Sequence, residues 1–397
     1  MGYGELVDRF TDDIELRVTA FPDGSVDTYY SVFDEHGERI TDRKTFGECI
    51  ACDDLTSIPI ERDSREPGGQ ATNMAVQAHA LGGEKTVVGH LDDPVFDGLP
   101  FETLSMGEPA RIDVYPFDDD DLVISRTSSD LDSWSLADLR AARSPSWDLL
   151  SADVVCCGNW ASLEGVTAAL AELAELAGEA DETDETGETG GASEGGTFVL
   201  DPGPVKNRPR VAVSELLTTL GELESAFDVV YSVSPAEFEY TVEAAGIEAE
   251  TDRERLAGVR EVTGISGVVL HASERAIVAT AEDNTDTETE TETELEREME
   301  SERQSGSEYE REREHERERE LDPVNVITVP NIEVERTRRR TGAGDRFSAR
   351  IAIARARGWN WEAALALGNL CAAYYVETAE TGDRFALLSY LDRRSTN

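Results

Sequence analysis

The distribution of apolar residues predicts alternating strands and helices over most of the chain. From residue 150 onward, short apolar runs rich in Val alternate with longer segments whose apolar residues recur every three or four positions. This alternation is typical of a mostly parallel sheet with helices on both faces, and it predicts a three-layer α/β fold. The strands are expected at 154–157, 198–200, 229–232, 267–271, 276–280 and 326–329, and the helices at 165–177, 211–223, 235–245, 345–357 and 361–376.

The first third of the chain has a different pattern. Residues 14–33 and 111–128 alternate apolar and polar positions around polar turns, as half-buried strands do. Residues 36–66 look like further short β pieces separated by polar turns. Since these pieces do not follow the strand–helix alternation, we expect those at about 20–66 and 111–128 to form a small β lid beside the main sheet.

Two low-complexity segments interrupt the predicted elements. Residues 178–197 are acidic, and residues 281–321 consist of Glu, Arg, Thr and Ser in near repeat. Neither segment has enough apolar surface to form a core. We therefore expect one domain over 14–390 with two inserts, the second of them a disordered, solvated loop.

The composition narrows the class of protein. The formal net charge is -48, from 84 acidic and 36 basic residues, and a charge of that size disfavours nucleic acid and anionic membranes as partners. The only lysines are Lys44, Lys85 and Lys206, a surface chemistry that resembles cytoplasmic proteins of salt-loving microbes. Five cysteines are too few for a disulfide framework, and the acidic start lacks the apolar core of a signal peptide. These features predict a soluble cytoplasmic protein.

The segment Thr341-Gly342-Ala343-Gly344-Asp345 carries the strongest chemical signal. Its two glycines allow close approach of the backbone to a ligand, and the amides of a helix N-terminus attract an anion. Asp345, on the first turn of that helix, is placed to take a proton from a hydroxyl. This combination suits phosphoryl transfer to an alcohol. The same residues also fit a tight strand-to-helix turn with a stabilising first-turn carboxylate.

A second glycine pair precedes an earlier predicted helix over 71–81. Gly68 and Gly69 permit close approach to a small polar ligand, and Asn73 offers both a donor and an acceptor to hydroxyl groups. A loop glycine pair followed by an exposed Asn is the alternative. No Walker A loop is present, since Gly-Lys-Ser/Thr does not occur, and Phe347 stands where a dinucleotide fingerprint needs its third glycine.

Together the two glycine motifs resemble the ribokinase/PfkB carbohydrate kinase family. The resemblance is carried by Pro67–Gly82, which contains GG-x-x-x-N, and by T-G-A-G-D in Thr341–Phe347. It covers roughly 14–390 without the inserts. It implies a ribokinase-like fold and a kinase that transfers the terminal phosphoryl group of a nucleotide, with Mg²⁺, to a hydroxyl of a sugar or sugar-like acceptor. ATP is the expected donor, and ADP is the alternative.

The resemblance also implies roles for individual residues of this chain. Asp345 would be the base that deprotonates the acceptor hydroxyl. The transferring phosphoryl group would be held by the amides of Gly342, Ala343 and Gly344. The acceptor would lie against Asp27, Gly68, Gly69 and Asn73. The nucleotide would lie against Thr341, Glu237 and Asn369, and Glu237 would serve Mg²⁺ through water.

Some residues depart from the family pattern. Ser234 replaces the Asn of the N-x-x-E motif that ends in Glu237, so Glu237 fits a first-turn helix charge equally well. Arg339 and Arg340 precede the Thr341 segment, and Arg346 follows its aspartate; these would repel a cation, contact nucleotide phosphates or bind an anionic acceptor. The alternative function is therefore a catalytically impaired sensor that binds sugar or nucleotide.

The remaining predictions concern His271 and assembly. His271 ends a predicted strand, where it either lines the nucleotide pocket or is a structural histidine with a partner. Its setting is similar to that of ADP-dependent sugar kinases, which keeps that donor open. A β lid with exposed edges would also allow a homodimer through the lid.

Overall fold

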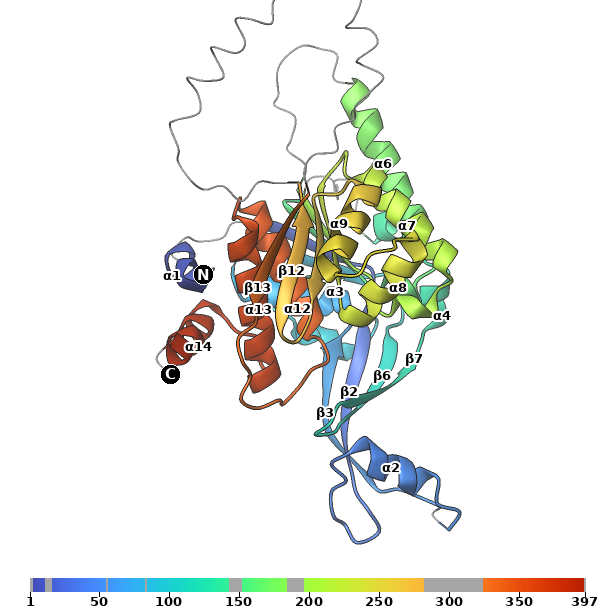
Figure 1. Ribbon diagram of the computed structural model, residues 1–397. Coiled ribbons are helices and arrows are strands. Elements are labelled where there is room, and N and C mark those ends of the chain that lie inside the picture. Colours follow the sequence, from blue (N-terminus) through green and yellow to red (C-terminus); the bar gives the residue numbers. More distant parts are fainter. Residues whose placement is uncertain are drawn as a thin grey trace, which may run out of the picture.

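The computed structural model describes most of the chain in one α/β arrangement (Figure 1). The described residues are 3–10, 16–54, 56–82, 84–142, 152–183, 196–281 and 324–395. Most of the two predicted inserts lies outside them. The described start of the first insert continues helix α6 (Val166–Thr183). No helix in the described residues is long and apolar enough to cross a membrane.

The centre of the structure is a nine-stranded, mostly parallel sheet. Its order is β13-β12-β11-β10-β9-β8-β1-β4-β5. The strands from β11 to β5 run parallel to one another, and at one edge β12 pairs antiparallel with both β11 and β13. The strands are β1 (Arg17–Phe21), β4 (Glu84–Gly89), β5 (Glu102–Ser105), β8 (Val154–Gly158), β9 (Thr197–Asp201), β10 (Asp228–Val233), β11 (Gly267–His271), β12 (Arg275–Thr280) and β13 (Asn325–Pro330).

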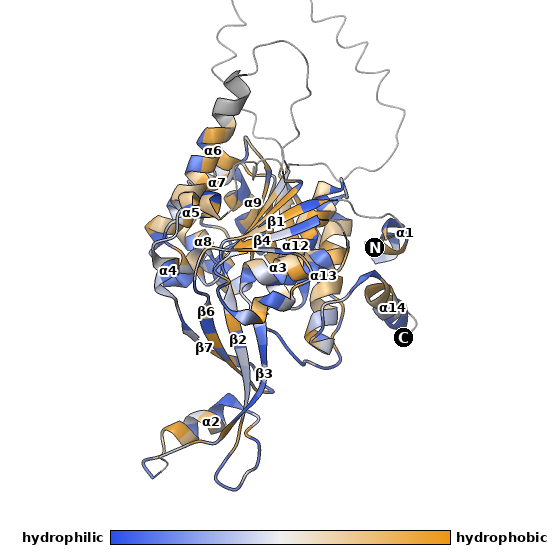
Figure 2. Ribbon diagram, turned by 180° about the vertical axis from the view of Figure 1, so that it is seen from behind, coloured by the Kyte–Doolittle hydropathy of each residue, from blue (hydrophilic) through white to orange (hydrophobic). Residues whose placement is uncertain are grey.

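Helices cover both faces of this sheet, as the sequence predicted (Figures 1 and 2). Side chains alternate between the faces along each strand, so Val199 of β9 joins one apolar core and its neighbours Phe198 and Leu200 join the other. The first core contains α3 (Gln70–His79), α12 (Ala343–Ala356) and α13 (Trp361–Thr378), and the second contains α6, α7 (Arg210–Leu223), α8 (Pro235–Ala245) and α9 (Asp252–Thr263).

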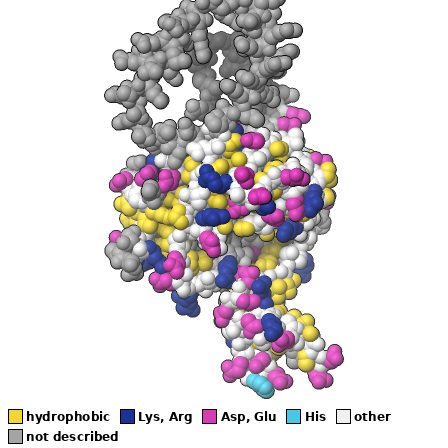
Figure 3. All heavy atoms as spheres, viewed as in Figure 1, with side chains coloured by type: hydrophobic (Ala, Val, Ile, Leu, Met, Phe, Trp, Pro, Cys, Tyr) yellow, Lys and Arg dark blue, Asp and Glu magenta, His cyan; other side chains and the backbone are white. Residues whose placement is uncertain are grey.

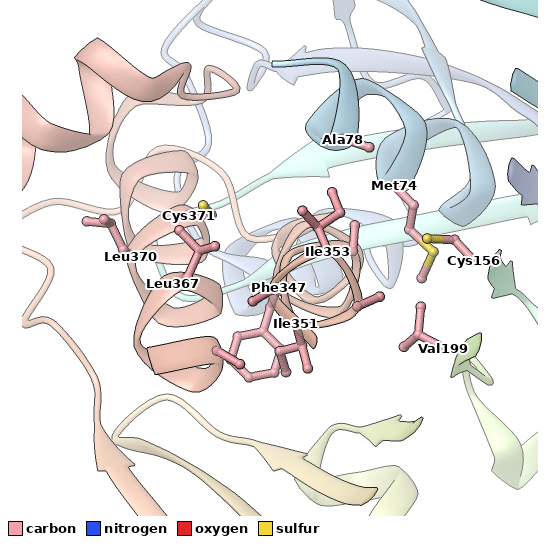
Figure 4. Close-up of a cluster of buried hydrophobic side chains, with 14 of the residues drawn as sticks. Met74, Ala78, Cys156, Val199, Phe347, Ile351, Ile353, Leu367, Leu370 and Cys371 are labelled. Carbon is pink, nitrogen blue, oxygen red and sulfur yellow. The ribbon is translucent and has the colours of Figure 1, made fainter. Parts of the chain in front are cut away.

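Helix α12 is buried on every side. Figure 4 shows it between α13, α3 and the sheet, with Phe347, Ile351 and Ile353 among the side chains that fill the gaps. Buried alanines let its neighbours approach closely, and residues on every face of the helix from Asp345 to Ala354 are buried. This packing fixes the position of the α12 N-terminus, where the predicted catalytic residues lie.

The predicted lid pieces pair as a second, four-stranded sheet in the order β3-β2-β6-β7. We call these strands and helix α2 the lid. It projects from the main body, with α2 at its free end (Figure 1). Acidic side chains are frequent on that end in the face shown in Figure 3. The lid consists of β2 (Ser25–Val32), β3 (Ile60–Gly68), β6 (Ala110–Pro116), β7 (Asp121–Arg126) and α2 (Arg43–Ile50).

The prediction of only β pieces over 36–66 was wrong, because α2 is a helix. Asp42 is its N-cap and accepts a hydrogen bond from the Thr45 backbone N–H at 2.8 Å. Phe46 of α2 packs into a small separate core with Val32 and Phe117. The local cap and this core outweigh the β tendency of the flanking residues.

Several further elements were not predicted from the sequence. They lie at the ends of the chain or in connections, apart from α9, whose N-terminus carries a capping box formed by Thr251 and Glu254. They are α1 (Tyr3–Arg9), α4 (Ser129–Asp132), α5 (Leu136–Ala141), α9, α14 (Arg384–Ser395), β5 and short 3₁₀ helices at Pro94–Gly98, Trp160–Ser162 and Val205–Asn207.

Candidate active site

Two helices of the first core begin side by side, each after a left-handed glycine. Gly69 precedes α3 with φ of 94°, and Gly342 precedes α12 with φ of 90°. Only glycine adopts this conformation without strain. A Cβ atom added to Gly342 would lie 3.2 Å from Nδ2 of Asn73 on α3. The two glycine motifs of the sequence are therefore neighbours in space.

The carboxylate of Asp345 is held by side chains of α3. Gln70 Nε2 donates to its Oδ1 at 3.0 Å, and Asn73 Nδ2 donates to its Oδ2 at 2.7 Å. The residue is only 7% exposed. Each carboxylate oxygen thus has one amide donor and free lone pairs left to accept from a ligand. The orientation of Asp345 is fixed before any substrate arrives.

Gln70 connects Asp345 to a second carboxylate. Its Nε2 also donates to Asp201 Oδ1 at 2.8 Å, and its Oε1 accepts from the Asn159 backbone N–H at 2.5 Å. Because the amide oxygen is committed to Asn159, the amide nitrogen must face the two acids. Gln70 therefore bridges Asp345 and Asp201.

The N-terminus of α3 already holds an anion from the chain itself. Asp23 accepts hydrogen bonds from the backbone N–H groups of Gln70 at 3.0 Å and Ala71 at 2.8 Å. Asn159 Nδ2 donates to it as well, at 3.1 Å. Burial raises the pKa of Asp23 above its usual value, and the charge of Asp345 adds to that.

The glycine pair before α3 makes room for the chain's own groups. A Cβ atom on Gly68 would overlap the Asp27 carboxylate, and one on Gly69 would come within 2.8 Å of the Gly24 Cα. Asp27 is buried on β2 and accepts from the Ser25 hydroxyl at 2.5 Å. Burial raises the pKa of Asp27 to about 6, although the Ser25 bond opposes this.

The N-terminus of α12, in contrast, carries no side-chain cap. The Ala343 N–H donates to the Arg340 carbonyl at 3.1 Å. For the N–H groups of Gly342, Gly344 and Asp345, no described residue acts as acceptor. The prediction placed the amides of 342–344 around the phosphoryl group. In the structure the N–H of Ala343 donates within a turn, and the N–H groups of Gly342 and Gly344 have no acceptor among the described residues.

Side chains of α12 and α13 hold this loop in place. Arg346 Nη1 donates to the Gly342 carbonyl at 2.8 Å, and its guanidinium lies 3.7 Å from the centre of the Tyr375 ring. The Tyr375 hydroxyl donates to the Thr341 carbonyl at 3.1 Å. Arg346 is buried and committed to the loop, so it supports the backbone rather than reaching toward an acceptor.

The lid touches the same loop at two points. Asp121 of β7 accepts from the Thr341 hydroxyl at 2.8 Å and from its N–H at 3.3 Å. Glu66 of β3 pairs with Arg339 at 2.8 Å, and the Arg339 guanidinium lies 4.0 Å from the centre of the Tyr29 ring. The lid is thus in contact with the segment that leads into α12.

Two more acids lie close to Asp345. Asp201 accepts from Ser348 at 3.0 Å in addition to Gln70, and Glu237 accepts from the Ser234 backbone N–H at 2.7 Å. Burial, and then the charges of Asp345 and Glu237, raise the pKa of Asp201 well above its usual range. Burial also raises the pKa of Glu237. Like-charged carboxylates that raise one another's pKa in this way form a region that a cation would stabilise.

A cavity of about 670 Å³ opens beside the α12 N-terminus. Gly344 and Ala343 form part of its wall, and His271 and Asn369 line it as well. Burial lowers the pKa of His271 to about 4, so its imidazole is neutral at neutral pH. Its Nε2 has no hydrogen-bond partner among the described residues. The expectation of a structural histidine with a partner is therefore not met.

Comparison with known proteins identifies the family. Residues 1–295 match the family of prokaryotic ketohexokinases, which is well over half of the chain. The chain belongs to that family. Among its curated relatives is the ketohexokinase of Haloferax volcanii, 24% identical over 286 residues, which are 69% of this chain and 70% of the relative.

Solved structures show the fold of this ketohexokinase-family protein. A carbohydrate kinase from Agrobacterium tumefaciens is 14% identical with a TM-score of 0.58, covering 96% of this chain and 97% of the other. A ribokinase from Thermotoga maritima is 15% identical with a TM-score of 0.54, covering 97% and 100%. Arabidopsis thaliana ribokinase complexed with ribose and ATP is 15% identical with a TM-score of 0.54, covering 95% and 99%.

These comparisons confirm the ribokinase-like fold and the ribokinase/PfkB resemblance. The protein is a kinase of the ribokinase family, a phosphotransferase that acts on a hydroxyl group. The family match ends at residue 295, before the Thr341 segment, whereas the structural likeness extends over that segment. The roles of individual residues in this ketohexokinase-family chain stay predictions.

The structure brings most of the predicted site residues together. Asn73 and Gly342 meet Asp345 at the two helix N-termini, and Asn369 lines the adjacent cavity. Glu237 caps α8 with Ser234, which confirms the first-turn helix charge, and its charge acts on Asp201; its role toward Mg²⁺ stays a prediction. The hydroxyl of Thr341, a residue predicted to lie against the nucleotide, donates to Asp121 of the lid.

Sequence reasoning missed the residues that hold this site in shape. Gln70 lies inside the motif between the glycine pair and Asn73, and its position there was the available signal. Asp23 follows the first strand in an ordinary Pro-Asp-Gly turn. Asp121 belongs to an acidic turn that looked like surface. None of them has a local pattern that reveals a partner distant in the sequence.

Proposed function

We propose that this protein transfers the terminal phosphoryl group of ATP to a hydroxyl of a ketohexose. The acceptor class follows from the family to which the chain belongs and from its curated relative. ATP follows from the structural neighbour complexed with ribose and ATP. ADP is the second donor to test. His271 lines the proposed donor cavity, and its setting in the sequence is similar to that of ADP-dependent sugar kinases.

One observation carries the proposal: a held carboxylate stands beside uncapped helix amides. Asp345 is fixed by Gln70 and Asn73, and the open N–H groups of Gly342 and Gly344 precede it directly. Phosphoryl transfer to an alcohol requires a base and an anion site next to each other, and here they lie within four consecutive residues. The cavity beyond Gly344 has room for a nucleotide.

In this proposal Asp345 accepts the proton of the attacking hydroxyl as the oxygen–phosphorus bond forms. The amides of Gly342 and Gly344 stabilise the negative charge on the transferring phosphoryl group, and the nucleoside diphosphate leaves into the cavity. Asp27 and Asn73 orient the acceptor. The lid over the loop excludes water and limits hydrolysis of the donor.

Asp201 and Glu237 are the residues that would serve Mg²⁺. In the described residues no group of three or more His, Cys, Asp or Glu is close enough to hold a metal ion by itself. Mg²⁺ keeps several waters and binds through one or two carboxylates plus substrate phosphates, which suits this pair. When bound, it neutralises charge on the donor phosphates.

The alternative of a non-catalytic sensor rested on the arginines and on Ser234. Arg346 packs on Tyr375 and Arg339 pairs with Glu66, so neither blocks Asp345. Ser234 lies in the cap of α8. These contacts favour the kinase over the sensor.

The test is nucleotide consumption by the purified protein in molar potassium chloride with Mg²⁺. The acceptors are ketohexoses, aldoses, sugar phosphates and nucleosides, with ATP and ADP as separate donors. We expect turnover with a ketohexose and ATP. Turnover only with another acceptor would correct the substrate class. Nucleotide binding without turnover on any acceptor would support the sensor.

We also propose that two copies associate through their lids. Ile60 on β3 and Val123 and Ile124 on β7 are large apolar residues about half exposed, and both strands are edges of the lid sheet. Light scattering in molar potassium chloride would give the mass. A dimer that Ile60→Lys with Ile124→Lys converts to monomer supports the proposal, and a monomeric wild type contradicts it.

A further inference from the structure

The three consecutive arginines before α12 differ in what they contact, although Arg338 and Arg340 are both exposed. Arg339 turns to the lid, where it pairs with Glu66 and stacks on Tyr29. Arg338 is exposed, and its backbone N–H donates to the Val376 carbonyl at 2.8 Å. Arg340 lines the cavity beside the α12 N-terminus. One of the three therefore faces the proposed donor site.

Arg340 is the one Lys or Arg among the described residues that line this cavity. Glu274 and Glu333 also line it and would repel an anionic donor. Within the described residues no carboxylate pairs with the Arg340 guanidinium, although Arg339 beside it is paired. In a chain with a net charge of -48, a cation left unpaired at a cavity is available for a ligand.

The backbone fixes the place of Arg340. Its carbonyl accepts from the Ala343 N–H, so it belongs to the turn that begins α12. The residues on either side are tied to the lid, Arg339 through Glu66 and Thr341 through Asp121. Alternate residues of this segment thus face the lid, while Arg340 faces the cavity next to the open amides.

We propose that Arg340 binds the polyphosphate of the nucleotide donor and that the lid contacts of Arg339 and Thr341 hold it in position. The inference rests on the proposed function, because it takes the cavity as the donor site. A guanidinium forms paired hydrogen bonds with phosphate oxygens. It would contact the phosphates that stay with the leaving nucleotide, whereas the amides of Gly342 and Gly344 contact the phosphoryl group that moves.

The test compares Arg340→Gln with Arg338→Gln, a matched change of an exposed arginine two residues away. Binding of ATP and of adenosine is measured by calorimetry in molar potassium chloride with Mg²⁺, together with the donor KM. Adenosine reports on the same cavity without phosphates. Arg340→Lys, which keeps the charge and loses the fork of donors, completes the series.

We expect Arg340→Gln to weaken ATP binding about 10-fold to 100-fold, as for a lost hydrogen bond to a charged group. Adenosine binding and the acceptor KM should not change, Arg340→Lys should be intermediate, and Arg338→Gln should equal the wild type. Unchanged ATP binding in Arg340→Gln, or an equal loss for adenosine, would overturn the inference. A wild type that binds neither ATP nor ADP would instead overturn the proposed function.

Discussion

The N-termini of α3 and α12 look alike in sequence and differ in what occupies them. Both follow a glycine with φ near 90°, and both belong to the same core. The first N–H groups of α3 donate to Asp23, a residue of the chain itself. Those of Gly344 and Asp345 in α12 have no acceptor among the described residues. The first N-terminus is occupied by the chain itself, and the second is the one that we propose binds a ligand.

The comparison shows that a glycine-led helix start is not by itself an anion site. Its amides attract whichever carboxylate or phosphate is nearest, and a side chain of the same protein competes with a ligand. At α3 the side chain of Asp23 occupies the amides in place of a ligand. At α12 the lid residue Asp121 binds Thr341 just outside the helix and leaves the helix amides without an acceptor among the described residues.

The largest expected effect comes from the residue that joins the two N-termini. Asp345→Asn removes the proposed base on α12 while keeping an oxygen that can accept from Gln70 or Asn73. We expect kcat to fall by about 100-fold to 10,000-fold. ATP affinity and the midpoint of thermal unfolding should change little. An activity near that of the wild type would show that another group takes the proton.

A smaller effect is expected from closing the α12 N-terminus. Gly342→Ala costs about 1–2 kcal/mol for its left-handed φ. The new Cβ would also lie 2.7 Å from Arg346 Nη1. Displacing the loop amides should lower kcat/KM by about 100-fold.

Gly246→Ala is the control for this substitution. Its φ is 69°, and no atom lies within 4 Å of the added Cβ. It should lose similar stability and keep full activity. If both variants lost activity equally, the loss would reflect backbone strain rather than the anion site.

Removing the carboxylate at the α3 N-terminus should lower stability more than it lowers the catalytic rate. Asp23→Asn leaves one of two buried N–H groups without a carboxylate oxygen, and we expect the free energy of unfolding to fall by about 1–3 kcal/mol. Because Asp23 only positions α3, kcat should change much less than in Asp345→Asn. Chemical denaturation and steady-state rates on the same samples would test this. A loss of kcat as large as for Asp345 would make Asp23 part of the chemistry.

The smallest effect is a dependence on pH through Asp27, beside the α3 glycine pair. Its pKa is raised in the fold to about 6, so its contribution to stability is present at low pH and lost as pH rises through 6. Going from pH 7.5 to 5.5 should therefore raise the free energy of unfolding by about 0.8 kcal/mol relative to Asp27→Asn.

Acceptor binding should respond in the opposite direction, because the neutral carboxyl accepts hydrogen bonds from sugar hydroxyls less well. The acceptor KM of the wild type should rise several-fold over the same pH interval, and that of Asp27→Asn should stay flat. Parallel pH profiles for the two proteins would exclude Asp27 from acceptor binding.

Local patterns were sufficient to place most strands, most helices and the two glycine motifs. Strand alternation and the helix start at Thr341 are properties of neighbouring residues, and Pro235–Ala245 and Gly267–His271 were predicted to the residue. The family resemblance then related two motifs that are far apart in sequence.

The contacts that give each motif its role were beyond such patterns. Gly68 faces Asp27, and Gln70 reaches Asp201 and Asp345, through pairings of segments many residues apart. The sequence cannot state which carboxylate fills which helix N-terminus, because that depends on how α3 and α12 pack. For the same reason Arg339 and Arg340 could not be assigned different surroundings.

The antiparallel pairing of β12 and β13 at the edge of the main sheet suggests where the protein could be split into two fragments. Thr280, the last residue of β12, pairs directly with Asn325, the first residue of β13. The other end of β12 adjoins the cavity beside α12, about 17 Å away at strand spacing. A break between the two strands would separate Asp345 from Asp23 and Asp27 covalently while a ladder of backbone pairs still joined the fragments. This kinase therefore offers a natural point for fragment complementation, with activity as the signal that two pieces have met.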